Sequence, residues 1–529
     1  MLFALKNFEK FGSICYCEYI LLRFGKLRVM TTKGYMVIMI DLTVCKESLE
    51  KNIQKARENN VILPTFKQMR NPGDNVPESI KEKLKGIGLW DVNPLNLFRV
   101  TWKNEPKMTG GLFGKPNYIE LPSALTGVDA KIICMVGKFF PTGCHKVGAS
   151  FGCLVPRLVT GQFNSAEQKA VWPSTGNYCR GGAFNSKLLA CESVAILPEG
   201  MSRERFDWLR TIAGEIIATA GTESNVKEIF DKTNELRATR DDVLIFNQFE
   251  EMGNYLWHYE ITGNAISEAF AQLSGKFGDA LNFAGICLMS GSAGSLAAGD
   301  QLKQKYPHSK IAVGEALQCP TILNNGFGDH RIEGTGDKHI PWVHNVKNTD
   351  MAIAIDDNDS MALLRLFNEP AGKEFLTAEL GMSKEDVEHL SYMGISGISN
   401  MLCAIKFAKY YELTDKDVVA TILTDSVEMY MSRIEELNEA EGTYTPLKAA
   451  VDYAAHLLAA KTDNLIELTY EGRRRVHNLK YYTWVEQQGR CAEELNDQWY
   501  HQDKTFESIQ GQAAQIDELI NEFNEAVGL

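Results

Sequence analysis

The chain has 529 residues, of which 44% are hydrophobic and 23% are charged, a composition typical of a globular protein with a large core. Its formal net charge of −13 argues against a nucleic-acid-binding protein, because phosphate groups require a basic surface. The 12 cysteines include no Cys-x-x-Cys pair and no zinc-like spacing, so we expect buried thiols in a reducing cytoplasm and no metal site. No apolar stretch is long enough to span a bilayer, so we expect no membrane partner.

Residues 1–38 differ from the rest of the chain, since they hold six Lys or Arg residues and two Asp or Glu residues. A targeting segment is one interpretation of this pattern. We favour a poorly ordered extension, or a start codon placed upstream of Met30, Met36 or Met39. Residues 39–113 then form an N-terminal helical region.

From residue 114 to residue 436, short apolar runs alternate with amphipathic stretches, which predicts strands separated by helices. Continuous apolar strands with intervening helices indicate a mostly parallel sheet covered on both faces. We expect strands at 131–136, 170–172, 193–198, 215–219, 284–290, 310–313, 351–355 and 418–423. Ligands of such sheets bind at the carboxyl ends of the strands, in the loops that lead into helices.

Residues 437–529 are rich in Glu, Ala, Leu and Gln at helical spacing, and we expect the strands to end near Arg433. This C-terminal helical extension would cap the protein or form an oligomer contact.

Two short segments offer groups for an imine-forming site. Lys146 ends a loop of small residues and leads into a helix, a position that suits an amine that must reach a carbonyl. Ser174-Thr175-Gly176-Asn177 follows an apolar run and offers backbone N–H groups and an amide to anionic and phenolic oxygens. Together they suggest a lysine above a pyridoxal phosphate ring. The ordinary interpretations are a surface lysine and a plain turn.

Two further segments follow predicted strands. The loop Gly291-Ser292-Ala293-Gly294-Ser295 comes before a helix, so its N–H groups can surround a phosphate. No Gly-Lys-Ser/Thr follows this loop, so we consider a nucleotide-phosphate site a weak alternative. Thr424-Asp425-Ser426 follows the strand at 418–423 and places a hydroxyl where it could contact the nitrogen of a cofactor ring.

Longer motifs connect these segments. Residues 197–205 read Leu-Pro-Glu-Gly-Met-Ser-Arg-Glu-Arg, close to the pattern Met-Pro-Glu-x-Met-Ser-x-Glu-Arg. Gln248-Phe249, His-Tyr-Glu-Ile-Thr-Gly at 258–263, His-Arg-Ile-Glu-Gly-Thr-Gly at 330–336 and Gly-Ile-Ser-Gly at 394–397 follow in order. On these motifs, collinear over about 320 residues, the chain resembles the cysteine synthase and cystathionine β-synthase family, the fold-type II pyridoxal phosphate enzymes.

The resemblance implies two lobes of mostly parallel sheet covered by helices, with helical N- and C-terminal extensions, and pyridoxal 5'-phosphate as the cofactor. Lys146 would form the imine with the cofactor and act as the catalytic base. Asn177 would bond the ring hydroxyl and Ser426 would face the pyridine nitrogen. The resemblance assigns the phosphate to Gly291, Ser292, Ala293, Gly294 and Ser295, and the carboxylate of a small amino-acid substrate to Ser174, Thr175, Gly176 and Gln248.

The implied activity is cysteine-synthase-like, with β-elimination or β-replacement through an aminoacrylate, and the implied assembly is a homodimer. The alternatives are a deaminating lyase, a synthase with another nucleophile, and a non-catalytic binding protein that keeps the fold. The residues before Lys146 depart from the family, which usually has Asn-Pro followed by Ser-x-Lys, so the substrate stays open. We expect the neighbouring His145 to point into the supporting structure rather than to act as an acid or base.

Overall fold

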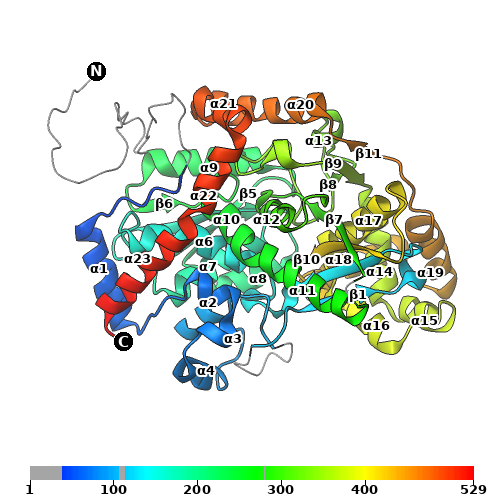
Figure 1. Ribbon diagram of the computed structural model, residues 1–529, viewed down its shortest axis with the longest axis horizontal. Coiled ribbons are helices and arrows are strands. Elements are labelled where there is room, and N and C mark those ends of the chain that lie inside the picture. Colours follow the sequence, from blue (N-terminus) through cyan, green and yellow to red (C-terminus); the bar gives the residue numbers. More distant parts are fainter. Residues whose placement is uncertain (1–38, 106–112, 279) are drawn as a thin grey trace.

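Two sheets organise the chain between its terminal helices (Figure 1). The computed structural model describes residues 39–105, 113–278 and 280–529, so the interpretations offered for residues 1–38 lie outside the described residues. Within this described part, the larger sheet has seven strands in the order β1-β2-β10-β7-β8-β9-β11. The smaller sheet has four strands in the order β5-β4-β3-β6.

The larger sheet is parallel except at its edges, where β1 and β11 pair antiparallel with their neighbours. Its strands are β1 (Tyr118–Leu121), β2 (Lys131–Val136), β7 (Asn282–Met289), β8 (Lys310–Ala316), β9 (Met351–Ile355), β10 (Asp417–Leu423) and β11 (Leu465–Glu467). The inner strands are buried on both faces, because consecutive residues such as Ile132 and Ile133 belong to cores on opposite sides of the sheet.

The smaller sheet is parallel throughout and consists of β3 (Lys169–Pro173), β4 (Ser193–Pro198), β5 (Glu215–Thr219) and β6 (Val243–Ile245). The two sheets confirm the expected α/β fold with two lobes of mostly parallel sheet covered by helices.

The sequence does not predict β1, β6 or β11. The expectation that strands end near Arg433 is wrong, because β11 extends the larger sheet beside β9. Both β6 and β11 are three residues long, and the side chains of β11 are partly or fully exposed. β6 lies in the apolar run Val-Leu-Ile-Phe at 243–246, which is too short to separate from a buried helix segment, and β11 is interrupted by Glu467.

Helices cover both faces of the larger sheet. On one face pack α11 (Gly263–Lys276) and α12 (Ala297–Lys305), and on the other α14 (Asp357–Asn368) and α17 (Ile395–Tyr410). The other helices used below are α1 (Lys46–Glu58), α2 (Phe66–Arg70), α8 (Arg203–Ile212), α9 (Val226–Thr239), α16 (Lys384–His389), α20 (Tyr470–Lys480), α21 (Ala492–Tyr500), α22 (Gln502–Gln510) and α23 (Gln512–Val527). None of the helices in the described ranges combines the length and apolarity needed to cross a membrane.

Close backbone contacts fix α6 (Lys146–Val159) between α7 (Asn177–Leu188) and α10 (Met252–Trp257). A Cβ added to Gly152 of α6 would lie 2.3 Å from the carbonyl oxygen of Gly253 in α10, and one added to Gly253 would lie 2.0 Å from that of Gly152. A Cβ at Gly181 of α7 would likewise approach the Val147 backbone to 2.8 Å. Side chains at these positions would force the helices apart and shift the residue at which α6 begins.

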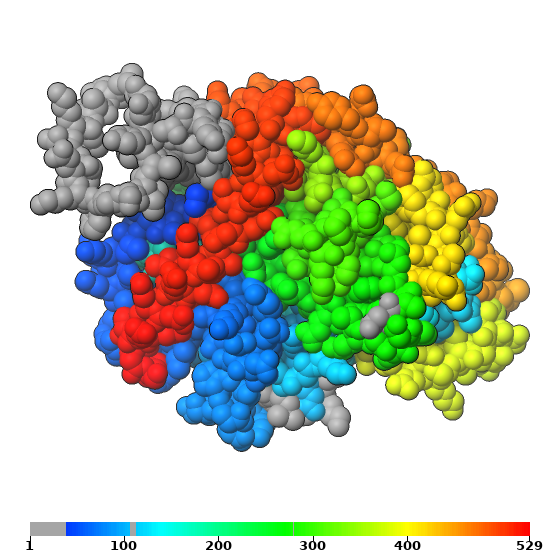
Figure 2. Space-filling model, in the orientation of Figure 1, coloured from blue at the N-terminus to red at the C-terminus, as the bar shows by residue number. Residues whose placement is uncertain are grey.

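The two ends of the described chain lie side by side, with α23 against α1 and α2 (Figure 1). The side chain of Asn524 pairs with both backbone groups of Leu63, and that of Gln512 pairs with both backbone groups of Ile40. The Asp517 carboxylate accepts the N–H groups of Phe66 and Lys67 at the start of α2. In the space-filling view the C-terminal helices form a continuous band across this face of the molecule (Figure 2).

A buried lysine attaches the C-terminal region to the segment 340–344. Lys480, at the end of α20, is fully buried, and its Nζ donates to the carbonyl oxygens of Trp342 (2.9 Å) and His344 (2.6 Å) and to the side chain of Gln498 (2.7 Å). Burial lowers the pKa of Lys480 well below its usual value. Trp484 adds a bond from its indole N–H to the Ile340 carbonyl, so several groups hold this segment.

We expect Lys480→Met to lower the free energy of unfolding by about 3 kcal/mol, because it keeps the apolar volume but leaves buried carbonyl oxygens without a donor. Chemical denaturation of the purified full-length chain measures the change. The matched control is Lys384→Met at an exposed position of α16, which should change the stability by less than about 0.5 kcal/mol. Equal stability of the two variants would contradict the anchoring role of Lys480.

Candidate functional site

A small cavity lies where loops from the two sheets meet. It is lined by the start of α6, the loops that follow β3, β5, β6, β7 and β10, and the segment 334–337. The lining residues are Lys146, Ser174, Thr175, Asn177, Tyr178, Glu223, Gln248, Phe249, Gly291, Ser292, Gly334, Gly336, Asp337 and Thr424. Its volume is about 20 Å³, room for about one water molecule with the side chains as they stand.

Lys146 is the first residue of α6, and its amine crosses the cavity to the loop after β7. Its Nζ lies 3.0 Å from the hydroxyl oxygen of Ser292 and 3.5 Å from Oε1 of Gln248. Burial lowers the pKa of the Lys146 amine. No ion pair within the described residues stabilises the charged form of this amine. The unprotonated form of Lys146 is therefore more accessible than that of an exposed lysine.

The loop after β7 presents a row of free backbone donors. Within the described part of the chain, the N–H groups of residues 291–295 have no hydrogen-bond acceptor from the protein. Ala293 has a φ of +59°, a left-handed conformation that costs a residue with a Cβ about 1 kcal/mol. A Cβ on Gly294 would lie 2.1 Å from Oδ1 of Asn254, so only glycine fits there. The backbone is therefore held in a strained, donor-lined turn, which suits an anion.

The loop after β3 leads into α7 and offers a second set of polar groups. The N–H of Gly176 donates to the hydroxyl of Ser174 at 3.0 Å, so the loop is folded back on itself. Asn177 donates from Nδ2 to the Asp425 carboxylate at 2.7 Å, while its buried Oδ1 has no partner among the described residues. The start of the twelve-residue helix α7 adds the positive end of its dipole.

Arg205 of α8 ties the loops of both lobes together. Its fully buried guanidinium donates to the carbonyl oxygen of Thr175 (2.9 Å) and the hydroxyl of Tyr430 (2.9 Å) and pairs with Glu333 at 2.8 Å. The carboxylates of Glu223 and Asp425 lie 3.9 Å away. Tyr430 in turn donates to Asp425 at 2.7 Å, so the partner of Asn177 is itself fixed.

Two acidic side chains that sequence reasoning missed, Glu223 and Asp337, face the same cavity as Lys146. Glu223 is 2% exposed and Asp337 is 7% exposed. Burial raises the pKa of Glu223 to about 8, opposed by Arg205 and a hydrogen bond with Thr175. Burial, and then the charge of Glu223, raise the pKa of Asp337, opposed by Lys146. Glu223 follows a parallel strand, which is the one sequence signal that could have indicated it.

The structure brings most of the sequence-derived residues to one place. Lys146, Ser174, Thr175, Asn177, Gln248, Gly291 and Ser292 all line the cavity. Gly176, Ala293, Gly294 and Ser295 lie in the same loops without lining it, and Ser426 is buried beside Asp425 at the end of β10. The roles expected for these residues remain predictions.

His145 lies behind the cavity rather than in its lining. Its ring stacks on Trp102 at 5.6 Å between ring centres and meets His258 edge to face at 5.1 Å. Burial lowers its pKa well below the usual range, so it is a neutral, packed ring. Cys144 and Cys179 are fully buried, and burial raises the pKa of each to about 12, which keeps both as thiols.

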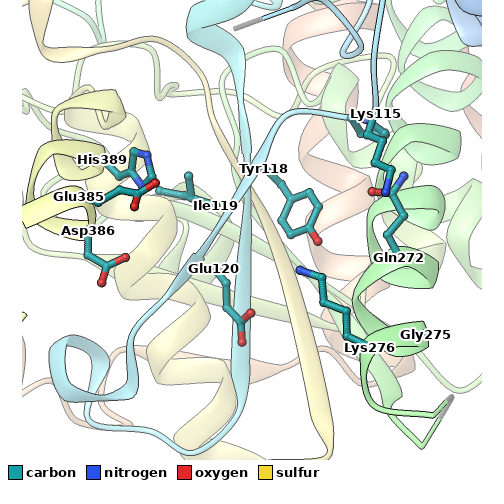
Figure 3. A pocket seen from close by; sticks show the side chains of 11 residues that line it. Lys115, Tyr118, Ile119, Glu120, Gln272, Gly275, Lys276, Glu385, Asp386 and His389 are labelled. Carbon is teal, nitrogen blue, oxygen red and sulfur yellow. The ribbon is translucent and has the colours of Figure 1, made fainter. Parts of the chain in front are cut away.

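A larger cavity, of about 780 Å³, lies along the edge strand β1 and contains none of the residues named as candidates. Figure 3 shows Tyr118 and Glu120 of β1 on the side of α11, which contributes Gln272 and Lys276. Ile119 points to the opposite side, towards Glu385 and His389 of α16. The volume of a cavity alone therefore does not identify the candidate site in this protein.

The groups around Lys146 fit the expected cofactor as donors. Unpaired N–H groups at residues 291–295 suit a phosphate, and the second N–H of the Asn177 amide suits a phenolic oxygen. The Lys146 side chain fills the space beside them, so a ring requires its amine to leave Ser292. These donors therefore fit the phosphate and ring oxygens of a pyridoxal phosphate.

Comparisons with known proteins agree with this donor set. No protein-family model matches the chain. It is 24% identical over 325 residues to a probable cysteine synthase of Bacillus subtilis, covering 61% of this chain and 96% of the relative. It is 28% identical over 290 residues to a cysteine synthase of Staphylococcus aureus, covering 53% and 84%.

A solved structure shows the same fold. O-acetyl serine sulfhydrylase isoform 3 of Entamoeba histolytica superposes with a TM-score of 0.51 at 19% identity, over 65% of this chain and 93% of that one. The sequence relatives and the fold agree with the collinear motifs at 197–205, 258–263 and 330–336. The chain is therefore similar in sequence to cysteine synthases and to a cystathionine β-synthase, and it has the fold expected from that resemblance.

Proposed function

We propose that the protein is a pyridoxal-phosphate-dependent enzyme that eliminates or replaces the β-substituent of a small amino acid. The observation that carries this proposal is the position of the Lys146 amine, 3.0 Å from Ser292, directly at a loop of acceptor-free N–H groups. The cysteine synthases among its relatives supply the reaction class.

In this proposal the loop 291–295 holds the phosphate, Asn177 the ring hydroxyl and Ser426 the ring nitrogen. When bound, the cofactor supplies an electron sink for the α-carbon of the amino acid. Ser174, Thr175, Gly176 and Gln248 bind the substrate carboxylate at the start of α7, where the helix dipole favours an anion. Lys146, with its pKa lowered by burial, removes the α-proton.

We further propose that residues 114–436 form the catalytic part, that the protein is a homodimer, and that it works in the cytoplasm. The match to the Bacillus subtilis relative spans 325 residues, about the length of this range, which supports the proposed catalytic part. Light scattering of the purified chain tests the dimer.

β-Replacement and deaminating elimination differ in their need for a nucleophile. With O-acetyl-L-serine as substrate, we expect a thiol product when sulfide is supplied and little pyruvate without it. Chromatography of the products with and without sulfide measures the ratio. Equal amounts of pyruvate and ammonia under both conditions would instead identify the lyase, and no reaction with any amino acid tested would favour the binding-protein alternative.

Lys146→Ala should abolish covalent attachment of pyridoxal phosphate, because no other amine lines the cavity among the described residues. The readouts are the visible absorption band of the purified protein and the mass of the peptide containing residue 146 after borohydride reduction. Lys187→Ala, at an exposed position of α7, is the matched control and should keep both signals. An unchanged adduct in Lys146→Ala would rule out the assignment.

Gln248→Leu should raise the KM for the amino acid about 10- to 100-fold, since a hydrogen bond to a charged group contributes about 1.5–3 kcal/mol. The absorption band should persist, because Gln248 is placed at the substrate rather than at the phosphate. Steady-state kinetics gives the KM, and the exposed Gln487→Leu serves as the control. Loss of the absorption band with an unchanged KM would contradict this assignment and would indicate that Gln248 contacts the cofactor instead of the substrate.

A further inference from the structure

A second cavity adjoins the one beside Lys146. Its volume is about 310 Å³, which is in the range of small-molecule sites, whereas the cavity beside Lys146 has room for about one water molecule. Glu223 lines both cavities, and the consecutive residues Glu333 and Gly334 line one each. A single layer of protein therefore separates the two, and we call the 310 Å³ cavity the boundary cavity.

The boundary cavity lies between the two lobes. The lobe of the smaller sheet contributes the loops that follow β4 and β5, and the lobe of the larger sheet contributes the segment 330–333, α14 and α18 (Met431–Glu441). A ligand in this cavity would therefore contact both lobes at once.

Ionic contacts that form part of the cavity wall hold the lobes together. Arg433 of α18 pairs with Glu333 at 2.7 Å and donates to the carbonyl oxygen of Gly200 in the loop after β4. Glu333 also pairs at 2.8 Å with Arg205, which belongs to the lobe of the smaller sheet. Because Arg433 and Glu333 line the boundary cavity, a ligand there would lie against the bonds that close the lobes.

One part of the lining is apolar. Met201, Met361 and Leu437 come from three different elements and are all buried. Thioether and branched apolar side chains pack well against an apolar ligand, and methionine adapts to its shape. This wall therefore favours a ligand with an apolar chain.

The polar groups of the lining that lack partners are hydrogen-bond donors. His330 is 5% exposed, and its Nδ1 accepts the N–H of Ile332 at 3.2 Å, so the ring proton lies on Nε2, which has no partner among the described residues. Burial lowers the pKa of His330 to about 4, so the ring is neutral. Arg331 binds Asp357 and Asn358 through Nη2, which leaves its Nε and Nη1 without a hydrogen-bond partner in the described part of the chain. Two adjacent side chains thus offer donors to an anionic group.

The acidic side chains of the lining already have guanidinium groups beside them. Glu436 accepts from Arg433 at 2.8 Å, and Glu333 lies between Arg433 and Arg205. Glu223 lies 3.9 Å from the same Arg205, and burial raises the pKa of Glu223 to about 8. These carboxyl groups therefore oppose an incoming anion only weakly.

We propose that the boundary cavity binds an organic monocarboxylate with an apolar chain, and that this ligand inhibits the enzyme by holding the two lobes closed. The carboxylate accepts hydrogen bonds from His330 and Arg331, and the chain packs against the apolar wall. The binding site stands without the function proposed above, whereas the inhibition rests on it.

Closure of the lobes inhibits because the substrate must reach Lys146. A cavity with room for about one water molecule admits no amino acid, so the lobes must open before each substrate enters. A ligand that contacts both lobes binds the closed arrangement more tightly and shifts the population towards it. Lys146 does not line the boundary cavity, so the ligand acts without entering the catalytic cavity.

Isothermal titration calorimetry of the full-length chain loaded with pyridoxal phosphate tests the site, with 4-methylpentanoate as the probe. This probe has no amine, thiol or β-leaving group, so it cannot react as a substrate. We expect a Kd below about 1 mM, and binding of acetate, which lacks the apolar chain, that is weaker by about tenfold or more. Arg331→Met should weaken binding of the probe about tenfold or more, because it removes a charged donor. Arg210→Met, at an exposed position of α8 outside the cavity, should bind the probe as the unaltered protein does.

Ala440→Trp is a second variant that keeps the test decisive if Arg331→Met fails to fold. Ala440 lines the boundary cavity from an exposed position of α18, so a large side chain there occupies the space without entering the core. We expect this variant to weaken binding of the probe about tenfold or more. Ala378→Trp, at the exposed end of α15 (Pro370–Ala378), is the matched control and should leave binding unchanged.

Steady-state kinetics tests the inhibition. With saturating probe, kcat/KM for the amino acid that the enzyme converts should fall about fivefold or more, a coupling typical of linked sites. In Ala440→Trp the probe should not change kcat/KM at the same concentration. The cofactor absorption band should stay unshifted by the probe in both proteins.

Other outcomes overturn the proposal. No binding of the probe, or equal binding by the unaltered protein and the cavity variants, would remove the site from the boundary cavity. A probe that shifts the absorption band binds beside Lys146 instead, and binding without a fall in kcat/KM contradicts the inhibition. Absence of the cofactor band in the unaltered protein would refute the proposed function, while calorimetry would still decide the binding site, so the two failures are distinguishable.

Discussion

The buried guanidinium of Arg205 is the interaction on which the candidate site depends. It joins the loop after β3, through Thr175, to Glu333 and Tyr430 in segments associated with the larger lobe. An uncompensated charge at such depth would cost several kcal/mol, but Glu333, Glu223 and Asp425 surround it and raise its pKa further. The same network orients Asn177 through Asp425. Removing the guanidinium would leave acidic groups facing one another across the lobe boundary, so the positions of the loops and the ionisation of the site are coupled.

The C-terminal extension contributes to this site from a distance. Lys480 and Trp484 bond the carbonyl oxygens of Ile340, Trp342 and His344, a few residues after Asp337. These bonds restrict a short segment without regular secondary structure, and side chains that line a binding site act only when their backbone is held in place. The C-terminal region therefore holds a segment that adjoins the cavity lining, in addition to covering the fold.

The parts of the structure that follow from the sequence are those with a local signal. The inner strands, such as β2 and β9, are continuous apolar runs, and the Lys146 and 291–295 segments sit at strand–helix junctions where parallel sheets bind ligands. β11 is short and exposed, and its pairing with β9 arises from tertiary contact alone. Glu223 and Asp337 are single acidic residues in ordinary loops, and their raised pKa values come from burial that appears only when both lobes close around them.

Charge balance links the buried carboxyl groups, the Lys146 amine and the anion site. The unpaired N–H groups of residues 291–295 favour an anionic ligand, and such a ligand raises the cost of an ionised carboxyl nearby because screening is weak in a buried cavity. Binding of the anion therefore strengthens the protonated form of Asp337, and by reciprocity the protonated form binds the anion more tightly. Glu223 is spared part of this cost by Arg205, whereas Asp337 has Lys146 alone. Filling of the anion site is consequently coupled more strongly to the protonation of Asp337 than to that of Glu223.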